Sequence, residues 1–206
     1  MKIPVTKKLI AIGLLALVGC SGDSTDSIQD TGSITVEFIL ASLPATITYN
    51  KPTTPDGYVE YKWSVTFDVN NDGVVNAGDI VLQILHFKMP GTAETTGTIE
   101  DLNASVWLYT TDTQTTRQVD AESSVAGNTI TISINRNRYP LLDLVKENTL
   151  VNFTCSTYDE IAGFSKYDYY PGFSTVTSIP LDGQFSDSQG DADFAYIDME
   201  AMHITL

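Results

Sequence analysis

Strict alternation of apolar and other residues constrains this chain more than any other feature of its sequence. In the clearest run, residues 58–67, every second residue is apolar: Val59, Tyr61, Trp63, Val65 and Phe67. Successive side chains of a β-strand point to opposite faces, so a period of two places all five on one face. An amphipathic helix needs a period near 3.6, which no long stretch of the chain shows. We therefore expect half-buried strands.

Further strand-like runs recur along the chain between clusters of Gly, Asn, Asp, Thr and Pro. They cover Ile34–Leu40, Ala104–Tyr109, Ile130–Ile134, Leu150–Thr157 and Phe194–Leu206. Only Pro140–Lys146 has the character of a short helical turn, with proline tolerated at its start. The pattern predicts an all-β fold, an antiparallel β-sandwich of the Ig-like or jelly-roll-like kind in which each sheet hides one apolar face.

An acidic twelve-residue segment follows the clearest strand and has the spacing of a calcium loop. Side-chain oxygens fall at loop positions 1, 3, 5, 9 and 12, at Asp68, Asn70, Asp72, Asn76 and Asp79. Val74 would offer its backbone carbonyl at position 7, and Gly73 stands at position 6, where the chain must turn sharply. Calcium prefers such hard oxygen ligands, so Ca²⁺ is the expected cofactor. The alternative is an Asp/Asn/Gly-rich hairpin loop without an ion.

The segment Asp-Val-Asn-Asn-Asp-Gly-Val-Val-Asn, followed by Gly-Asp-Ile-Val-Leu, resembles the calcium-binding repeat of dockerins and other EF-hand-like proteins. The resemblance covers about twenty residues and implies the same six ligand positions. A dockerin carries two such repeats and docks onto a cohesin, whereas this chain has no second good copy, so cellulosome assembly is not implied. Asp79 at the last position is shorter than the usual EF-hand Glu, although dockerin repeats commonly end in Asp.

Residues 80–88 fit two periods. Ile80, Ile84 and Phe87 suit a helix, whereas Ile80, Leu82 and Ile84 suit a strand. The β-branched, apolar composition favours a strand that pairs with residues 59–67, with the acidic loop as the connection between them. A bound ion would then tie two core strands together.

The amino terminus has the order of parts of an export signal. Lys2, Lys7 and Lys8 precede an apolar stretch from Leu9 to Gly19. That stretch is shorter than the roughly 20 residues a membrane-spanning helix needs, so we expect it to be removed.

Leu17-Val18-Gly19-Cys20 resembles the lipobox of bacterial lipoproteins. The resemblance implies that Cys20 becomes the lipidated first residue of a membrane-anchored protein that is periplasmic or surface-exposed. Ser21 follows the cysteine where an Asp would favour the inner membrane, so the outer membrane is expected. The alternative is an ordinary secretory signal with an incidental cysteine.

Three segments follow from these observations. Residues 1–19 form the signal peptide, and residues 20–33 form the lipidated cysteine and a polar tether that cannot bury enough surface to fold. Residues 34–206 are long enough for one domain with a substantial core. Cys155 lies on the apolar side of an alternating run, so a buried core thiol is expected instead of a nucleophile.

The charge of the chain is strongly negative. Removal of residues 1–19 takes three of the 11 Lys and Arg and none of the 26 Asp and Glu, so the formal charge changes from −15 to −18. Such a field repels nucleic acids and anionic surfaces and attracts cations. A second acidic segment contains Asp187, Asp191 and Asp193, with Asp198 further on. Its spacing fits no ligand template, so it is either a solvated loop or a second cation site.

Four aromatic residues gather beside a Pro-Gly turn, at Tyr167, Tyr169, Tyr170 and Phe173. Such rings can form a platform for a glycan or a protein, or they can cap the end of the sandwich.

No catalytic signature is visible: the chain has no G-x-S-x-G, H-E-x-x-H or glycine-rich phosphate loop, and no catalytic residue is expected. The sequence favours a calcium-binding, membrane-anchored binding module for extracellular glycan or protein. The alternatives are a structural surface lipoprotein without a ligand and a small polysaccharide-active enzyme that uses two of the acids.

Overall fold

The computed structural model describes residues 32–43, 46–48, 59–88, 96–98, 105–112, 117–159, 164–188, 190–192 and 194–206. The predicted signal peptide and lipidation site, and the tether up to residue 31, lie outside these residues. Gly32 immediately precedes the first strand, which starts one residue before the predicted domain. Within the described ranges, no helix is long and apolar enough to cross a membrane.

The described chain is all-β, with two short 3₁₀ turns. Its elements are β1 (Ser33–Leu40), β2 (Thr46–Thr48), β3 (Val59–Asp68), β4 (Ile80–Lys88), β5 (Thr96–Thr98), β6 (Ser105–Thr110), β7 (Arg117–Gln118), β8 (Glu122–Ala126), β9 (Thr129–Asn135), η1 (Arg136–Arg138), η2 (Pro140–Leu144), β10 (Leu150–Asp159), β11 (Phe164–Tyr170), β12 (Thr177–Ser178), β13 (Gln184–Ser186) and β14 (Met199–Thr205).

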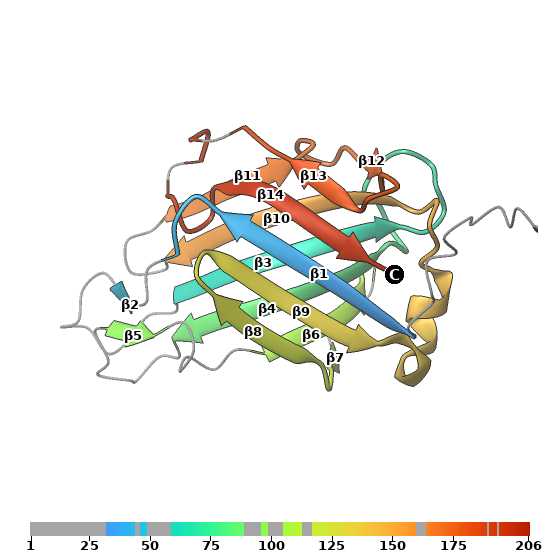
Figure 1. Cartoon of the computed structure of the whole chain (residues 1–206), viewed down its shortest axis with the longest axis horizontal. Helices are drawn as coiled ribbons and strands as arrows, with labels where there is room; N and C mark the ends of the chain where they lie inside the picture. Colours follow the sequence, from blue (N-terminus) through green and yellow to red (C-terminus); the bar gives the residue numbers. More distant parts are fainter. Residues whose placement is uncertain are drawn as a thin grey trace, which may run out of the picture.

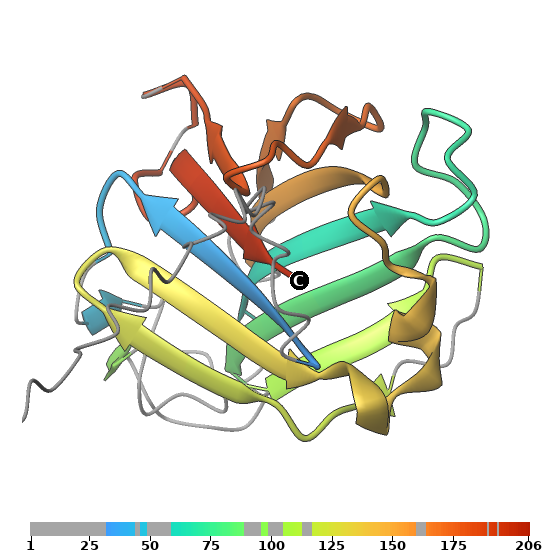
Figure 2. The same ribbon diagram turned by 45° about the vertical axis from the view of Figure 1, so that its right-hand side comes forward.

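Two antiparallel sheets face each other as the layers of a sandwich (Figures 1 and 2). In the described part of the chain, one sheet has the order β13-β14-β1-β9-β8, and the other has the order β11-β10-β3-β4-β6-β7, with β12 also paired to β10. A small separate pair joins β2 and β5. The predicted antiparallel β-sandwich is confirmed.

The core consists of the inward side chains that alternation predicted. Ile34, Val36, Phe38 and Leu40 of β1 are fully buried, and their neighbours along the strand are only partly so. Phe38 of one sheet meets Phe153 of the other edge-on, with ring centroids 5.9 Å apart. Trp63 is fully buried, as expected, and its indole N–H donates to the Tyr196 carbonyl at 3.1 Å. Burial of each such large side chain contributes roughly 1.5–3 kcal/mol.

Residues 80–88 form a strand, as predicted. β4 pairs antiparallel with β3, with Phe67 opposite Ile80 at the end next to the acidic loop. Ile80, Leu82 and Ile84 are buried on the core face, so the period of two prevails over the helical period here. The acidic loop is therefore the connection of a hairpin between two central strands.

One predicted strand boundary was wrong. The final strand starts at Met199, not Phe194, because residues 194–198 form a turn. The backbone N–H groups of Ile197 and Asp198 both donate to the Phe194 carbonyl, at 2.9 and 3.0 Å. The rings of Phe194 and Tyr196 stack 5.3 Å apart, an i, i+2 contact that stabilises the turn.

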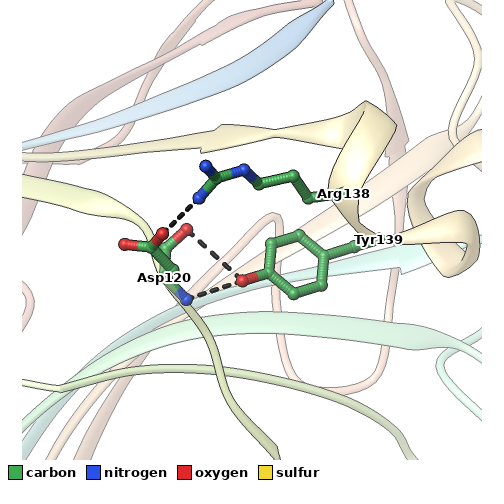
Figure 3. A network of polar contacts seen from close by, with 3 residues as sticks. All are labelled: Asp120, Arg138 and Tyr139. Atoms are coloured by element: carbon green, nitrogen blue, oxygen red, sulfur yellow. Dashed lines mark hydrogen bonds and ion pairs between the residues drawn. The ribbon is translucent and has the colours of Figure 1, made fainter.

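The predicted short helical turn is present as η2, directly after η1. Tyr139 between the two turns is buried, and its hydroxyl accepts a hydrogen bond from the Asp120 backbone N–H at 2.6 Å (Figure 3). The Arg138 guanidinium contacts the Asp120 carboxylate (Figure 3). Both charged side chains are largely exposed, so the buried tyrosine, more than the ion pair, fixes these turns against the segment before β8.

Candidate functional site

The predicted calcium loop, residues 68–79, starts and ends in the core. Asp68 is the last residue of β3 and Asp79 immediately precedes β4, and both side chains are fully buried. Asp72 in the middle of the loop is exposed. The connection extends beyond the ends of the strands at one end of the sandwich (Figure 2).

Backbone N–H groups hold the first ligand positions toward the inside of the loop. The two carboxylate oxygens of Asp68 accept from Asp72 N–H at 3.3 Å and Gly73 N–H at 2.9 Å. The side-chain oxygen of Asn70 also accepts from Asp72 N–H, at 3.0 Å, and Asp72 Oδ1 accepts from Val74 N–H at 3.2 Å. The chain thus wraps around the oxygens that the sequence predicted as ligands.

The remaining side chains converge on Asp72. The amide nitrogens of Asn70 and Asn76 both donate to Asp72 Oδ2, Asn70 at 3.2 Å. The Asn70 amide also reaches Asn76 Oδ1 at 3.4 Å. A rotation of either amide by half a turn would present its oxygen to the same point, and such a rotation exchanges atoms of nearly equal size.

Asp79 carries the least satisfied atom of the loop. Its Oδ2 accepts from Asn76 N–H at 2.8 Å, but its Oδ1 is buried without a hydrogen-bond partner among the described residues. Burial raises the pKa of the Asp79 carboxyl and the charges of Asp68 and Asp72 raise it further, whereas the backbone N–H groups of Asn76 and, more weakly, Val69 lower it. A buried, unpaired carboxylate oxygen beside two like charges is costly. A cation bound in the loop would remove that cost.

Gly73 has the conformation that the loop requires. Its φ is +93°, in the left-handed region, and a Cβ placed there would meet nothing within 4 Å. The glycine is therefore needed for the backbone turn, not for space, as its loop position predicted. The Val74 side chain is exposed, which leaves this position to act through its backbone.

The loop carboxylates are not tightly gathered. Of the residues the structure describes, only Asp168, Asp187 and Asp191 place three acidic ligand atoms within 4.8 Å of one another. Calcium–oxygen distances are about 2.3–2.6 Å, so ligands on opposite sides of the ion lie up to about 5 Å apart. The three loop carboxylates do not come within 4.8 Å of one another, so binding of one ion would draw them closer together.

The main chain of the loop is joined to the segment after β11, a contact that the sequence did not reveal. Val74 forms an isolated antiparallel bridge with Thr175, and Val75 N–H donates to the Ser174 carbonyl at 3.2 Å. The Asn152 amide fixes the same segment from β10, donating to the carbonyls of Gly172 at 2.9 Å and Thr175 at 2.7 Å. Residues 171–176 are thus held between the loop and the sheet.

Three of the four predicted platform residues form one exposed cluster, called here the aromatic surface: Tyr167, Tyr169 and Phe173. The Tyr167 and Tyr169 rings are stacked 5.6 Å apart, and Phe173 meets Tyr169 edge-on at 5.2 Å. Tyr167 is 50% exposed and Phe173 is 74% exposed.

Tyr170 does not belong to the aromatic surface. Its ring packs against Phe185 of the core at 6.0 Å, because alternation along β11 turns it to the opposite face from Tyr169. The alternative role predicted for these rings, capping the end of the sandwich, therefore fits Tyr170. It does not fit Phe173.

Cys155 is buried in β10, as predicted. Burial raises the pKa of its thiol well above the usual value, and the charges of Asp168 and Asp187 add to the effect. The thiolate is therefore disfavoured, and with it any nucleophilic role.

No protein-family model, curated protein or solved structure matches this chain.

Proposed function

We propose that this protein is a calcium-binding, membrane-anchored exported module that uses the aromatic surface to bind a neutral extracellular glycan. The bridge between Val74 of the calcium loop and Thr175 of the segment that bears Phe173 carries this proposal. Through this contact, order in the loop would be transmitted to the ligand surface.

Calcium is favoured as the ion by the chemistry of the loop. Three carboxylates and two amides supply oxygen ligands, and calcium takes about six to eight of these in a flexible shell. The buried Asp79 oxygen that has no partner among the described residues favours a bound cation. Transition metals that prefer nitrogen and sulfur ligands fit this set poorly.

A neutral glycan is favoured as the ligand by the surface and the charge. Exposed rings with hydroxyl groups offer both an apolar face and hydrogen-bond partners, which suits a sugar ring. The formal net charge of −15 would repel anionic polymers. Anchorage through Cys20 would place the module outside the cytoplasm, where a low-affinity calcium site can be filled.

Retention of the purified protein on immobilised neutral polysaccharides would test the proposal, with the wild type compared with Phe173→Ala. We expect the variant to bind about tenfold more weakly because it loses the most exposed ring of the aromatic surface. Removal of calcium by a chelator should also weaken polysaccharide binding by the wild type. Leu181→Ala is the matched control, since Leu181 is a fully exposed apolar residue outside the aromatic surface.

If Phe173→Ala were retained as strongly as Leu181→Ala, the aromatic surface would have no glycan-binding role. The same conclusion would follow if the wild type were retained on no polysaccharide. Release of reducing sugar by the wild type would instead indicate an enzyme.

A further inference from the structure

We propose that Asp168, Asp187, Asp191 and Asp198, called here the edge cluster, form a second calcium site that joins the two sheets. This inference rests on residues outside the calcium loop.

The four acids come from both sheets at one edge of the sandwich. Asp168 lies in β11, the end strand of one sheet. Asp187 follows β13, the end strand of the other, and Asp198 immediately precedes β14. β11 and β13 run along the same edge (Figure 1). The Met199 backbone N–H donates to Asp168 Oδ2 at 2.7 Å, so the two sheets are in direct contact here.

Three of the four acids have the geometry of a ligand group, and Asp198 lies outside that group of three. One ligand atom from each of Asp168, Asp187 and Asp191 lies within 4.8 Å of the others. Asp168 is 6% exposed and Asp198 is 3% exposed, whereas Asp191 is exposed and leaves the cluster open to solvent on one side. An ion could therefore enter without unfolding of the edge.

Two buried carboxylate oxygens in the edge cluster have no hydrogen-bond partner among the described residues: Asp198 Oδ1 and Asp187 Oδ2. The other oxygen of Asp198 accepts from Gly190 N–H at 2.9 Å, which places this carboxylate against the segment between Asp187 and Asp191. An unpaired, deeply buried carboxylate oxygen beside other acids is unfavourable unless a cation binds it.

The electrostatics agree with this geometry. Burial raises the pKa of Asp168 to about 6, against the Met199 bond, with further increases from the charges of Asp187 and Asp191. Burial also raises the pKa of Asp187, and the charges of Asp191 and Asp198 contribute. No described basic side chain forms an ion pair with the four acids.

Calcium fits this group better than magnesium does. The ligands are carboxylates only, each of which can bind through one or two oxygens, as calcium accepts. Magnesium requires near-ideal octahedral geometry and retains several waters, which a site built from two sheets and a loop does not favour. The Asp168 side chain projects inward between the outward rings of Tyr167 and Tyr169. The second ion would thus also fix the strand that bears the aromatic surface.

Titration of the purified protein with calcium chloride, followed by calorimetry, would test the proposal. We expect two calcium ions per wild-type chain, one for Asp191→Asn, one for Asp72→Ala and none for the double variant. Asp191 is exposed and accepts no hydrogen bond from a described residue, so the fold should survive its substitution. Asp187→Asn is a second variant in case Asp191→Asn does not fold. Asp143→Asn, at an exposed acid in η2, is the control.

Each outcome decides between the two sites. If Asp191→Asn and Asp187→Asn both retain the wild-type stoichiometry and affinity, the edge cluster is not a calcium site, whatever Asp72→Ala does. If only the edge variants lose an ion or bind it at least about tenfold more weakly, the edge site is supported and the calcium loop of the proposed function is contradicted. A wild type that binds no calcium would overturn both.

Discussion

The calcium loop and the edge cluster gather acids in opposite ways. In the loop the acids lie within one hairpin connection, and backbone N–H groups already satisfy most of their oxygens, including both oxygens of Asp68. In the edge cluster the acids come from separate segments, and two buried oxygens have no partner among the described residues. The edge cluster therefore depends more on a cation or on protons than the loop does, in which Asp79 Oδ1 is the one carboxylate oxygen without a partner among the described residues.

Calcium removal should have the largest effect, because it acts on both sites. With dissociation constants of order 10⁻⁵ M, millimolar calcium contributes about 2.7 kcal/mol per site. Two sites would raise the melting temperature by roughly 10–20 °C for a domain of this size. Thermal melts in excess calcium and in chelator measure the shift. Identical melting temperatures would contradict calcium binding at either site.

Single substitutions in the two regions should change the stability measured in chelator in different ways. Asp72→Ala removes the acceptor for Val74 N–H and two amides, so it should lower stability both in calcium and in chelator, by about 1 kcal/mol in the latter. Asp191→Asn should lower stability in calcium but leave it unchanged or raise it in chelator, because it removes a like charge. Chemical unfolding in both conditions tests this contrast. Parallel effects of the two variants would remove the distinction.

Two glycines offer a smaller, matched comparison. Gly73 in the loop and Gly190 between Asp187 and Asp191 have φ values of +93° and +79°. A Cβ added at either position would have no other atom within 4 Å. Alanine at either position should cost about 1–2 kcal/mol through backbone strain. Gly73→Ala should weaken one calcium-binding event and Gly190→Ala the other, as measured by calorimetry. Loss of the same event in both variants would contradict two independent sites.

The pH dependence should show the smallest effect, and only in chelator. The pKa of Asp168 is about 6 in the folded protein against 3.8 as its ordinary value, so the folded state holds a proton that the unfolded state releases between these values. Stability should therefore rise as pH falls from 7 toward 4, opposite to an ion-paired Asp. Melts of the wild type and Asp168→Asn across this range measure it. An equal slope in the variant would assign the effect to other groups.

The two regions differ in how far they could be predicted from the sequence, because one is formed by neighbouring residues and the other by distant segments. The strands β1, β3 and β9, and the hairpin of β3 and β4, were predictable because alternation is local and the core lies on one face of each. The position of residues 68–79 as the connection between β3 and β4 was predictable for the same reason, whereas ion binding by this loop stays a prediction.

The edge cluster could only be suspected from the sequence. The sequence groups Asp187, Asp191, Asp193 and Asp198 as an acidic segment, of which Asp193 lies outside the described residues. Asp168 stands between two tyrosines in the sequence, and its proximity to these acids depends on how the sheets meet. Thr175 and Asn152 likewise carry no local signal, because their contacts join distant segments. The strand expected from Phe194 is wrong because local hydrogen bonds to the Phe194 carbonyl form a turn there, and one hydrogen bond from the Trp63 indole to the Tyr196 carbonyl adds a tertiary contact.

A crystal structure of the protein grown in millimolar calcium, with anomalous scattering recorded, tests the central claim most directly. We predict an anomalous peak within about 2.3–2.6 Å of oxygens from Asp68, Asp72 and Asp79, together with the Val74 carbonyl. An ordered calcium loop with no such peak, and with Asp79 Oδ1 bound to water or to another protein group, would contradict it.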